Sequence, residues 1–243
     1  MQYRADFLLQ GLLGLMWVGV SLIPLNVLYR DRQSIAGWTW PQALLVTGWF
    51  TALRAALEGA VSPSLTAVVE HVRRGTLDFV LLKPADSQFL VSTARFEPWK
   101  VLDLGASFVI MGWAFHQMGR APAPLDLAAA ALLGLVALIV LYSMWILVIS
   151  LSFFIVRADN LSFLFSSLLD AARWPVQVFR GALRFLFTFI FPLALMTTYP
   201  AMAMMGTLDA TTAGTALLVG FSFAAVARVV WLRALRNYTS ASS

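Results

Sequence analysis

The sequence predicts an all-α polytopic membrane protein, and three features of the chain carry this prediction. Hydrophobic residues make up 60% of the 243 residues, and the mean hydropathy is +0.80. Only 12% of the residues are charged, against roughly a quarter in typical soluble domains. Several apolar runs approach or exceed the ~20 residues that a helix needs to cross hydrocarbon. These runs are continuous and not alternating, which disfavours a transmembrane barrel.

Four membrane spans are predicted in the N-terminal two thirds of the chain. Pro41 stands where the first turn of the second span is expected, a position that suits proline. The fourth run is longer than a span requires, so its helix is expected to tilt or to leave the bilayer. The four apolar runs lie at residues 7–28, 42–62, 98–118 and 127–156.

The C-terminal third predicts a fifth span, a re-entrant hairpin and a last span at 213–232. Residues 161–206 are too long for one span and too charged in the middle for two ordinary ones. Pro192 and Pro200 break helices within the hairpin expected at 185–206. Backbone of this kind is tolerated at membrane depth when protein buries it. The whole chain, 1–243, is thus expected to form one membrane domain of six transmembrane helices.

The basic residues predict the orientation, because Lys and Arg collect in cytoplasmic loops. With six crossings and both termini inside, the outer loops receive only Arg30, Arg32 and Arg120. Residues 63–97 then lie in the cytoplasm, and the protein is expected in a bacterial inner membrane. The inner side receives Arg4, Arg73, Arg74, Lys83, Arg95, Lys100, Arg157, Arg228, Arg233 and Arg236.

Several classes of function lack their residues in this chain. There is no cysteine, which excludes disulfides, thiolate metal sites and cysteine nucleophiles. His71 and His116 lie on opposite sides of a predicted span, so no metal centre is expected. The chain has no phosphate-binding loop, nucleophile elbow or zinc-protease motif. We expect no enzymatic activity, and the net charge of +5 is explained by membrane orientation and not by nucleic acid.

Residues 63–97 form the longest polar interval of the chain. Apolar residues recur at helical spacing over 64–72, which predicts a short amphipathic helix along the membrane surface. Gly75 is placed to end that helix, and Pro84 to end the apolar piece that follows. The pattern alone fits a surface helix with solvated charges as well as an element that docks into a cytoplasmic partner.

Charged residues also interrupt the predicted spans. Arg54 and Glu58 are four residues apart, so they lie on one helix face and are expected to pair. The pair either joins two helices or lines a transport path or dimer interface, and the structural role is favoured because unpaired charge in a membrane is costly. Arg173 and Arg180, with Arg184, are spaced to share another helix face, which either lies at the inner membrane interface or lines a wet cavity. Arg173 and Arg180 are therefore further candidates for a translocation path or dimer interface.

Five stretches of the sequence resemble one family of membrane proteins. Residues 73–84, "RRGTLDFVLLKP", resemble the signature of type-2 ABC (ATP-binding cassette) exporter permeases. The N-terminal "YRADFLLQ" at 3–10 and "AGWTWPQALLVTGW" at 36–49 are similar to the family's first and second helices. The tail "LRALRNYTSASS" at 232–243 is similar to its C-terminus, and "FPLALMTTYPAMAMMG" at 191–206 resembles its re-entrant hairpin.

The resemblance implies a permease subunit that works as a dimer with a copy of itself or a related chain. It implies a separate ATPase subunit, which would bind ATP and Mg while this chain holds no cofactor. The loop at 63–97 would then carry the coupling helix, with Gly75 and Pro84 shaping it. The candidate ATPase contacts are Glu70, Arg73, Arg74, Asp78 and Lys83, whereas Leu77 and Leu81 are expected to pack inward.

Two other functions stay open at this point, an ion-coupled secondary transporter and a membrane scaffold without a transport cycle. Pseudo-symmetric halves, which many secondary transporters show, are not detectable in the sequence. Tyr199 lies beside methionines at 196, 202, 204 and 205, a patch that could bind apolar ligands but more often serves packing. No residue identifies a substrate.

Overall fold

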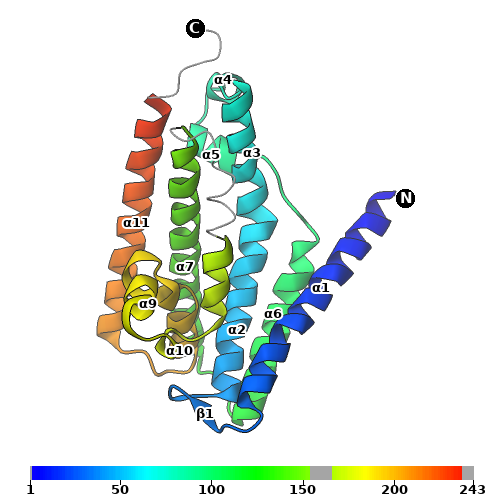
Figure 1. The fold of residues 1–243 in the computed structure, drawn as a ribbon, viewed down its shortest axis with the longest axis vertical. Helices are drawn as coiled ribbons and strands as arrows, with labels where there is room; N and C mark the ends of the chain where they lie inside the picture. The colour runs from blue at the N-terminus through cyan, green and yellow to red at the C-terminus, as the bar shows by residue number, and fades with distance from the viewer. Residues whose placement is uncertain (1, 154–165, 237–243) are drawn as a thin grey trace.

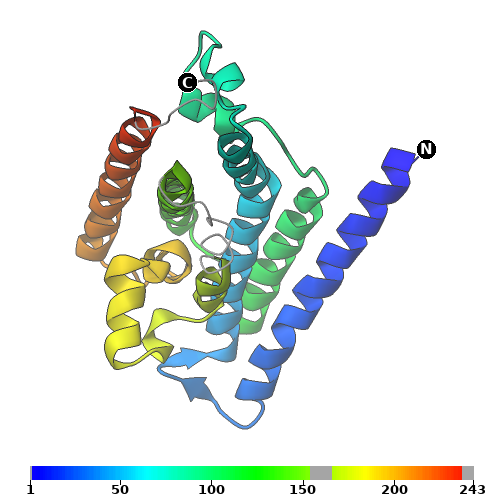
Figure 2. The same ribbon diagram turned by 45° about the horizontal axis from the view of Figure 1, so that its top comes forward.

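The computed structural model describes residues 2–153 and 166–236, without the side chains of five residues in that range (Gln2, Tyr3, Arg73, Ser152 and Phe189). The first helix, α1 (Gln2–Tyr29), runs down one side of the molecule and diverges from the other helices toward its N-terminus (Figures 1 and 2). Its membrane-length segment is only 11% buried. The apolar face of α1 is therefore available to lipid or to another chain.

A short hairpin turns the chain back from α1. Strands β1 (Ser34–Ile35) and β2 (Trp38–Thr39) pair antiparallel, and Ala36 and Gly37 between them both have positive φ. Two such residues make the tight loop that joins neighbouring strands. Thr39 then caps α2 (Trp40–Ala56) through a capping box with Gln42, and Pro41 lies in the first turn as expected.

The second helix does not end at the expected position near residue 62. A π-helical turn, η1 (Leu57–Val61), joins α2 directly to α3 (Ser62–Arg74), and a membrane-length helix runs from Trp40 to Val72. The amphipathic segment at 64–72 is therefore a continuation of the second span and not a separate helix lying across its end (Figure 1). The helical segments on both sides of η1 keep α-helical backbone angles at their caps, so the chain has no break at which to turn.

Gly75 ends this long helix as expected. Its φ of 65° is left-handed, and the amides of Gly75 and Thr76 bind the carbonyls of Val72 and His71, which is the Schellman arrangement. Two short helices follow at the same end of the molecule, α4 (Asp78–Leu81) and α5 (Ser87–Ser92), with an irregular stretch at 93–99. The chain then returns along α2 in α6 (Lys100–Met118).

The centre of the bundle is α7 (Pro124–Ser150), which continues into a short 3-10 turn, η2 (Leu151–Phe153). The last helix, α11 (Ala210–Arg236), packs along α7, and Gly220 gives room to Val136. Small residues that let helices approach closely are typical of packing in membranes. One end of the molecule, opposite the β hairpin, holds three features (Figure 1). They are helix α4, the N-terminal end of α1 and the C-terminal end of α11.

The segment between α7 and α11 departs from the predicted fifth span. Residues 154–165 lie outside the described residues, and 166–206 contain only short pieces interrupted at Pro175 and Pro192. Since proline removes an amide donor and clashes with the preceding turn, neither position continues a helix. The pieces are 166–169, η3 (Asp170–Arg173), η4 (Val176–Val178), α9 (Gly181–Phe185), η5 (Leu186–Ile190), η6 (Ala194–Thr198) and α10 (Tyr199–Met204).

Two arms of this segment, α9 with η5 and η6 with α10, are separated at Phe191–Leu193. The second arm is buried from Leu193 to Thr198 and packs on α7 and α2, so protein covers its backbone. Only this second arm matches the buried hairpin that the sequence predicts, because all five residues of α9 in the first arm are exposed. The depth of the hairpin in a membrane stays a prediction. Arg173 and Arg180 do not share a helix face, because Trp174 and Pro175 have extended backbone between them.

Four helices among the described residues are long and apolar enough to cross a membrane. They confirm an all-α polytopic membrane protein, whereas the count of six spans stays a prediction. The third expected span corresponds to α6, which has 19 residues but carries Lys100 and Asp103 and is not among the four. The four are Arg4–Tyr29, Trp40–Val72, Pro124–Ser150 and Ala210–Arg236.

A prediction follows from the packing of α2 on α7. A Cβ at position 134 would lie 2.7 Å from the Trp49 ring, so Gly134→Ala is expected to lower the free energy of unfolding by about 1–3 kcal/mol through overpacking. The matched control is Gly112→Ala on α6, where an added methyl group meets open space. SDS titration followed by circular dichroism measures both variants, and equal stability would contradict the close approach of α2 and α7.

Candidate functional site

The C-terminal half of α3 presents two distinct faces. Leu65, Val68 and Val69 are buried against the bundle, whereas Glu70 and Arg74 are exposed and form an ion pair across one helical turn. Exposed pairs of this kind contribute little stability, so both groups are available for other contacts. The side chain of Arg73 lies outside the described residues.

The short helix α4 also divides into an inner and an outer face. Leu77 is fully buried and Leu81 packs on the core, as expected. Phe79 and Leu82 point the other way, with exposed fractions of 71% and 80%. Asp78 begins α4, and Lys83 and Pro84 are exposed directly after it. We call this surface, made of Phe79, Leu82, Lys83 and Pro84, the α4 tip.

Phe79 and Leu82 are the residues that sequence analysis missed at this end of the molecule. It named the charged residues of the motif and treated apolar residues as inward-facing. The spacing held a signal, because Leu77 and Leu81 are four apart and share one face, which leaves Phe79 and Leu82 on the opposite one. An exposed aromatic and an exposed leucine side by side with a lysine fit a protein contact better than a solvated turn.

Helix α5 connects the α4 tip to the last helix. Asp86 caps α5 by accepting from the Phe89 amide, and its carboxylate also accepts both terminal nitrogens of Arg228 on α11, at 3.1 and 2.5 Å. Arg228 further donates to Gln88 at 2.9 Å, and the Trp231 indole donates to Ser87. We call these contacts the α5–α11 link.

The link is held by charge. The Arg228 hydrogen bond, and then the Phe89 amide, hold the pKa of Asp86 below its usual range. A carboxyl group whose pKa is lowered on folding stabilises the fold at pH values above its ordinary pKa, which is about 3.9 for aspartate. This contribution is lost only as the pH falls through the lowered pKa. The link is therefore fully charged at neutral pH.

A second group of charges lies between α2, α6 and η3. The Arg54–Glu58 pair that the sequence predicts forms at 2.7 Å, and Lys100 reaches the other oxygen of Glu58 at 2.6 Å. Lys100 also bonds Asp103 at 3.1 Å, and Arg54 reaches Asp170 at 2.9 Å. Asp170 in turn accepts from Arg173 at 3.0 Å. We call these six side chains the charge network.

The network contains three cations and three anions, so it is neutral as a unit. Lys100 and Asp103 are its most buried members, with 18% and 11% of their side chains exposed. Asp103 Oδ1 has no hydrogen-bond partner among the described residues and faces Gly14 on α1, where a Cβ would collide with it. The predicted pair is thus part of a larger structural unit that ties two spans to the segment after α7.

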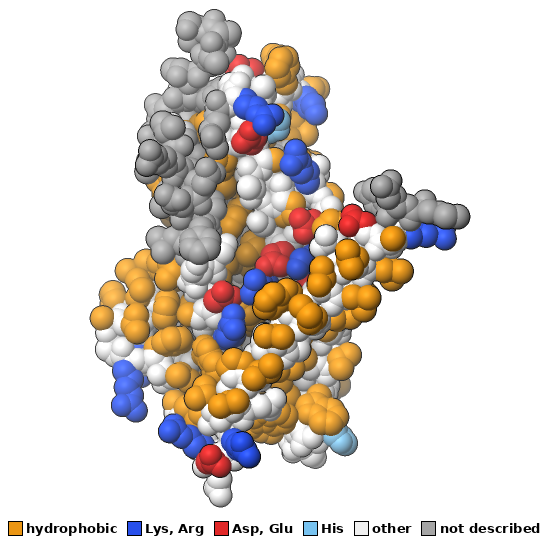
Figure 3. All heavy atoms as spheres, turned by 45° about the vertical axis from the view of Figure 1, so that its right-hand side comes forward, with side chains coloured by type: hydrophobic (Ala, Val, Ile, Leu, Met, Phe, Trp, Pro, Cys, Tyr) orange, Lys and Arg blue, Asp and Glu red, His pale blue; other side chains and the backbone are white. Residues whose placement is uncertain are grey.

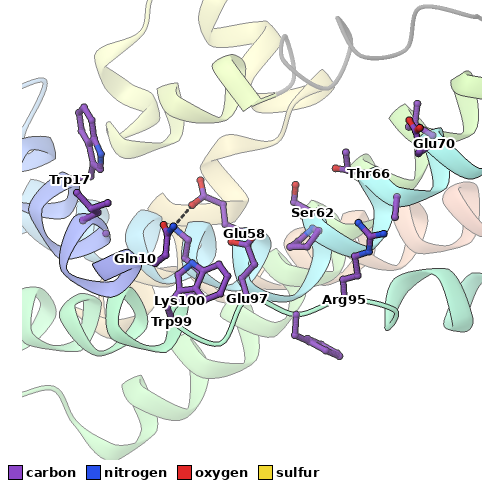
Figure 4. A pocket seen from close by; sticks show the side chains of 16 residues that line it. Gln10, Trp17, Glu58, Ser62, Thr66, Glu70, Arg95, Glu97, Trp99 and Lys100 are labelled. Atoms are coloured by element: carbon purple, nitrogen blue, oxygen red, sulfur yellow. Dashed lines mark ion pairs between the residues drawn. The ribbon is translucent and has the colours of Figure 1, made fainter. Parts of the chain in front are cut away.

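A cavity of about 1080 Å³ opens beside the network between α1, α3 and the stretch at 95–100 (Figures 3 and 4). A smaller cavity of about 520 Å³ adjoins it and shares Gly14, Trp17, Glu58 and Lys100. Figure 3 shows acidic and basic side chains gathered in the hollow next to the apolar face of α1. The charge network is therefore reachable from outside the bundle.

Of the remaining expected site residues, Arg173 lines the smaller of these two cavities, and the others line neither. Arg180 is exposed at the start of α9 and lines none of the larger cavities described, whereas Arg173 is part of the network. Tyr199 is half-buried and packs on the core beside buried Met196, in line with a packing role for this patch. Pro192 stands at the break of the hairpin, as expected. The expectation that Pro200 breaks a helix is wrong: η6 runs directly into α10 with helical backbone, and proline is tolerated in the first turn of α10. Among the described residues, no group of three His, Asp or Glu could hold a metal ion.

Comparison with known families gives one match that covers most of the chain. Residues 15–242 match a family model described as ABC-2 family transporter protein. Neither a curated protein nor a solved structure matches the chain.

The charge network predicts an asymmetric response to substitution. Lys100→Met removes the one ion-pair partner that the Asp103 carboxylate has among the described residues, so the free energy of unfolding is expected to fall by about 3–5 kcal/mol. Adding Asp103→Asn removes the stranded charge and should recover part of that loss. The exposed pair gives the control, since Arg74→Met should cost less than about 1 kcal/mol. Denaturant titration in detergent measures all three, and an equal loss in the single and double variants would show that Asp103 is not a buried charge.

Proposed function

The chain belongs to the ABC-2 family of transporter proteins, and from that premise we propose that it is the membrane permease of an ATP-driven exporter. A separate ATP-binding subunit supplies the energy and holds ATP and Mg, because this sequence has no phosphate-binding loop. The chain itself acts as a transport component and not as an enzyme. Family membership favours this function over the ion-coupled transporter and the scaffold.

The observation that carries the proposal is the α4 tip. It projects at the end of a helix that continues straight from a membrane span, and it presents an apolar pair beside charged residues (Figure 1). A central apolar contact with a charged rim is the usual anatomy of a protein interface. The ATPase subunit would bind Phe79 and Leu82, with Glu70, Arg74 and Lys83 around them.

The membrane arrangement follows from the same assignment. The α4 tip faces the cytoplasm, and both chain ends lie on that side, in accord with the excess of Lys and Arg there. The exposed apolar faces of α1 and α11 leave room for a second permease subunit in the bacterial inner membrane. ATP binding would move the ATPase subunits, and the permease would shift between two arrangements that differ in access to the path.

A substitution at the α4 tip tests the ATPase contact. Leu82→Asp places a charge in the apolar pair, so the amount of ATPase subunit that co-purifies with the tagged permease should fall at least about tenfold, a loss of roughly 1.4 kcal/mol. Membrane insertion should not change, because Leu82 is exposed. Thr93→Asp, exposed beyond α5, is the matched control. Normal co-purification of the Leu82 variant would reject the α4 tip as the docking surface.

The α5–α11 link is expected to carry movement of the tip to the last span. Asp86→Arg places a second cation against Arg228 and breaks the link. The permease should still bind the ATPase, because the α4 tip is unchanged, but its stimulation of ATP hydrolysis should fall several-fold. Combining Asp86→Arg with Arg228→Asp restores an ion pair and should restore stimulation. ATPase rates in reconstituted vesicles measure this, and failure of the double variant to recover would mean that the link serves stability alone.

A further inference from the structure

The large cavity beside α1 is not used by the ATPase contact, and its lining combines opposite charges with aromatic rings. Trp17 from α1 and Trp99 before α6 line it, as do the hydroxyls of Ser62 and Thr66 on α3 (Figure 4). These four side chains come from three parts of the chain that are distant in sequence. A concave site of this size with a few convergent polar groups is the usual form of a small-molecule site.

The charges in the lining divide into paired and unpaired ones. Glu58 and Lys100 are neutralised within the charge network, and Glu70 is paired with Arg74. Arg95 and Glu97 line the same cavity, and neither has an ion-pair partner among the described residues. The cavity thus offers one cation, the exposed Arg95, and one anion, the half-buried Glu97, that are not engaged in ion pairs with described residues, and their charges cancel.

The backbone holds these two residues at fixed positions along the long helix. Ser64 Oγ accepts from the Arg95 amide at 2.8 Å and donates to the Arg95 carbonyl at 2.7 Å. The Glu97 amide donates to the Gly59 carbonyl at 2.8 Å. Gly59 and Ser64 are separated by about 7.5 Å of helix rise, so the Arg95 and Glu97 backbones are anchored at two separate levels.

Figure 4 shows how the lining is ordered along the cavity. Arg95 lies at the α3 end, where Ser62 and Thr66 are drawn, and Glu97 lies toward Trp99 and the charge network. The cationic end thus has hydroxyl donors near it, and the anionic end has an indole ring. Hydroxyls and a guanidinium together bind phosphate well, and a carboxylate with an aromatic face suits an ammonium group.

The depth of the cavity in the membrane identifies the kind of ligand. Trp40 begins α2, and Trp residues favour the membrane boundary. With Trp40 taken as one edge of the hydrocarbon, Glu58 lies about 27 Å further along the helix and Thr66 about 39 Å, at about 1.5 Å per residue. The hydrocarbon is about 30 Å thick, and about 40–45 Å with the headgroups. The cavity then extends from the hydrocarbon edge at Glu58 to the headgroup level at Thr66, in the leaflet on the α4 side. Exposed apolar residues of α1, among them Leu12 and Met16, provide a surface for acyl chains next to it.

We infer that this cavity binds the headgroup of a zwitterionic phospholipid, with its phosphate at Arg95 and its ammonium at Glu97. Ser62 and Thr66 donate to the phosphate, and Trp99 covers the ammonium. Because the unpaired charges cancel, the site discriminates against anionic phospholipids, which would leave Glu97 unpaired and repelled. The binding requires only the permease chain in a bilayer, so it stands or falls separately from the ATPase contact.

The test uses the full-length chain in nanodiscs of controlled composition, with bound lipid counted by native mass spectrometry. The probes are phosphatidylethanolamine, phosphatidylcholine and phosphatidylglycerol at equal concentration. Wild-type chain should retain a zwitterionic lipid over phosphatidylglycerol by about tenfold, since hydrogen bonds to charged groups contribute about 1.5–3 kcal/mol. Equal retention of all three, or a preference for phosphatidylglycerol, would overturn the proposal.

Two variants separate the roles of the charges without disturbing the fold, because neither side chain forms an ion pair within the described part of the chain. Glu97→Gln leaves a net positive cavity, so the preference should shift from zwitterionic lipid toward phosphatidylglycerol. Arg95→Gln should weaken retention of every phospholipid about tenfold. Arg236→Gln, which changes an exposed arginine at the same end of the molecule but outside the cavity, is the control and should match wild type. Unchanged selectivity in Glu97→Gln would reject the assignment.

A last arm separates a membrane lipid from a soluble ligand of the same chemistry. Glycerophosphoethanolamine carries the headgroup without acyl chains, so it should displace the bound lipid only at concentrations at least a hundredfold higher than the lipid itself. Displacement at equal concentration would overturn the lipid assignment and indicate a water-soluble zwitterion. Circular dichroism and gel filtration of each variant confirm that a loss of binding does not come from unfolding.

Discussion

The ammonium of Lys100 is the group on which much of this structure depends. It lies in an apolar bundle with only 18% of its side chain exposed, so it needs anions, and it contacts Glu58 on the second span and Asp103 on its own helix. Its Cβ also lies close to Gly59, where any larger residue would push it away. This contact fixes where α6 starts against η1. The chain at 93–99 and the cavity that it lines take their positions from that start.

Much of the fold could be predicted because long apolar runs identify membrane spans in the sequence. The limits of α1, α6, α7 and α11 fall close to the apolar runs, and Gly75 ends its helix through a left-handed turn that glycine favours. The pairing of Arg54 with Glu58 followed from spacing alone. These features depend on residues near one another in sequence, where periodicity is informative.

What could not be predicted depends on contacts distant in sequence. Lys100 and Glu58 are far apart in the chain, as are Arg228 and Asp86, and no period links them. The π turn at η1 left no signal, so α3 was expected to lie along the membrane and not to extend α2. Arg173 and Arg180 were expected on one helix face, but the extended backbone at Trp174 and Pro175 separates them. Phe79 and Leu82 were not predicted as site residues, because the apolar residues of this segment were expected to face inward.

The helix is unbroken from α2 through η1 into α3, so α3 would move as one rod that tilts at the π turn η1. From Ser62 to Arg74 the rod extends about 20 Å, at about 1.5 Å per residue. A tilt of about 10° at η1 would therefore move the Arg74 end of α3 roughly 3 Å sideways. A force applied at the far end of α3 would therefore act as a torque on η1, where Glu58 is held by the charge network.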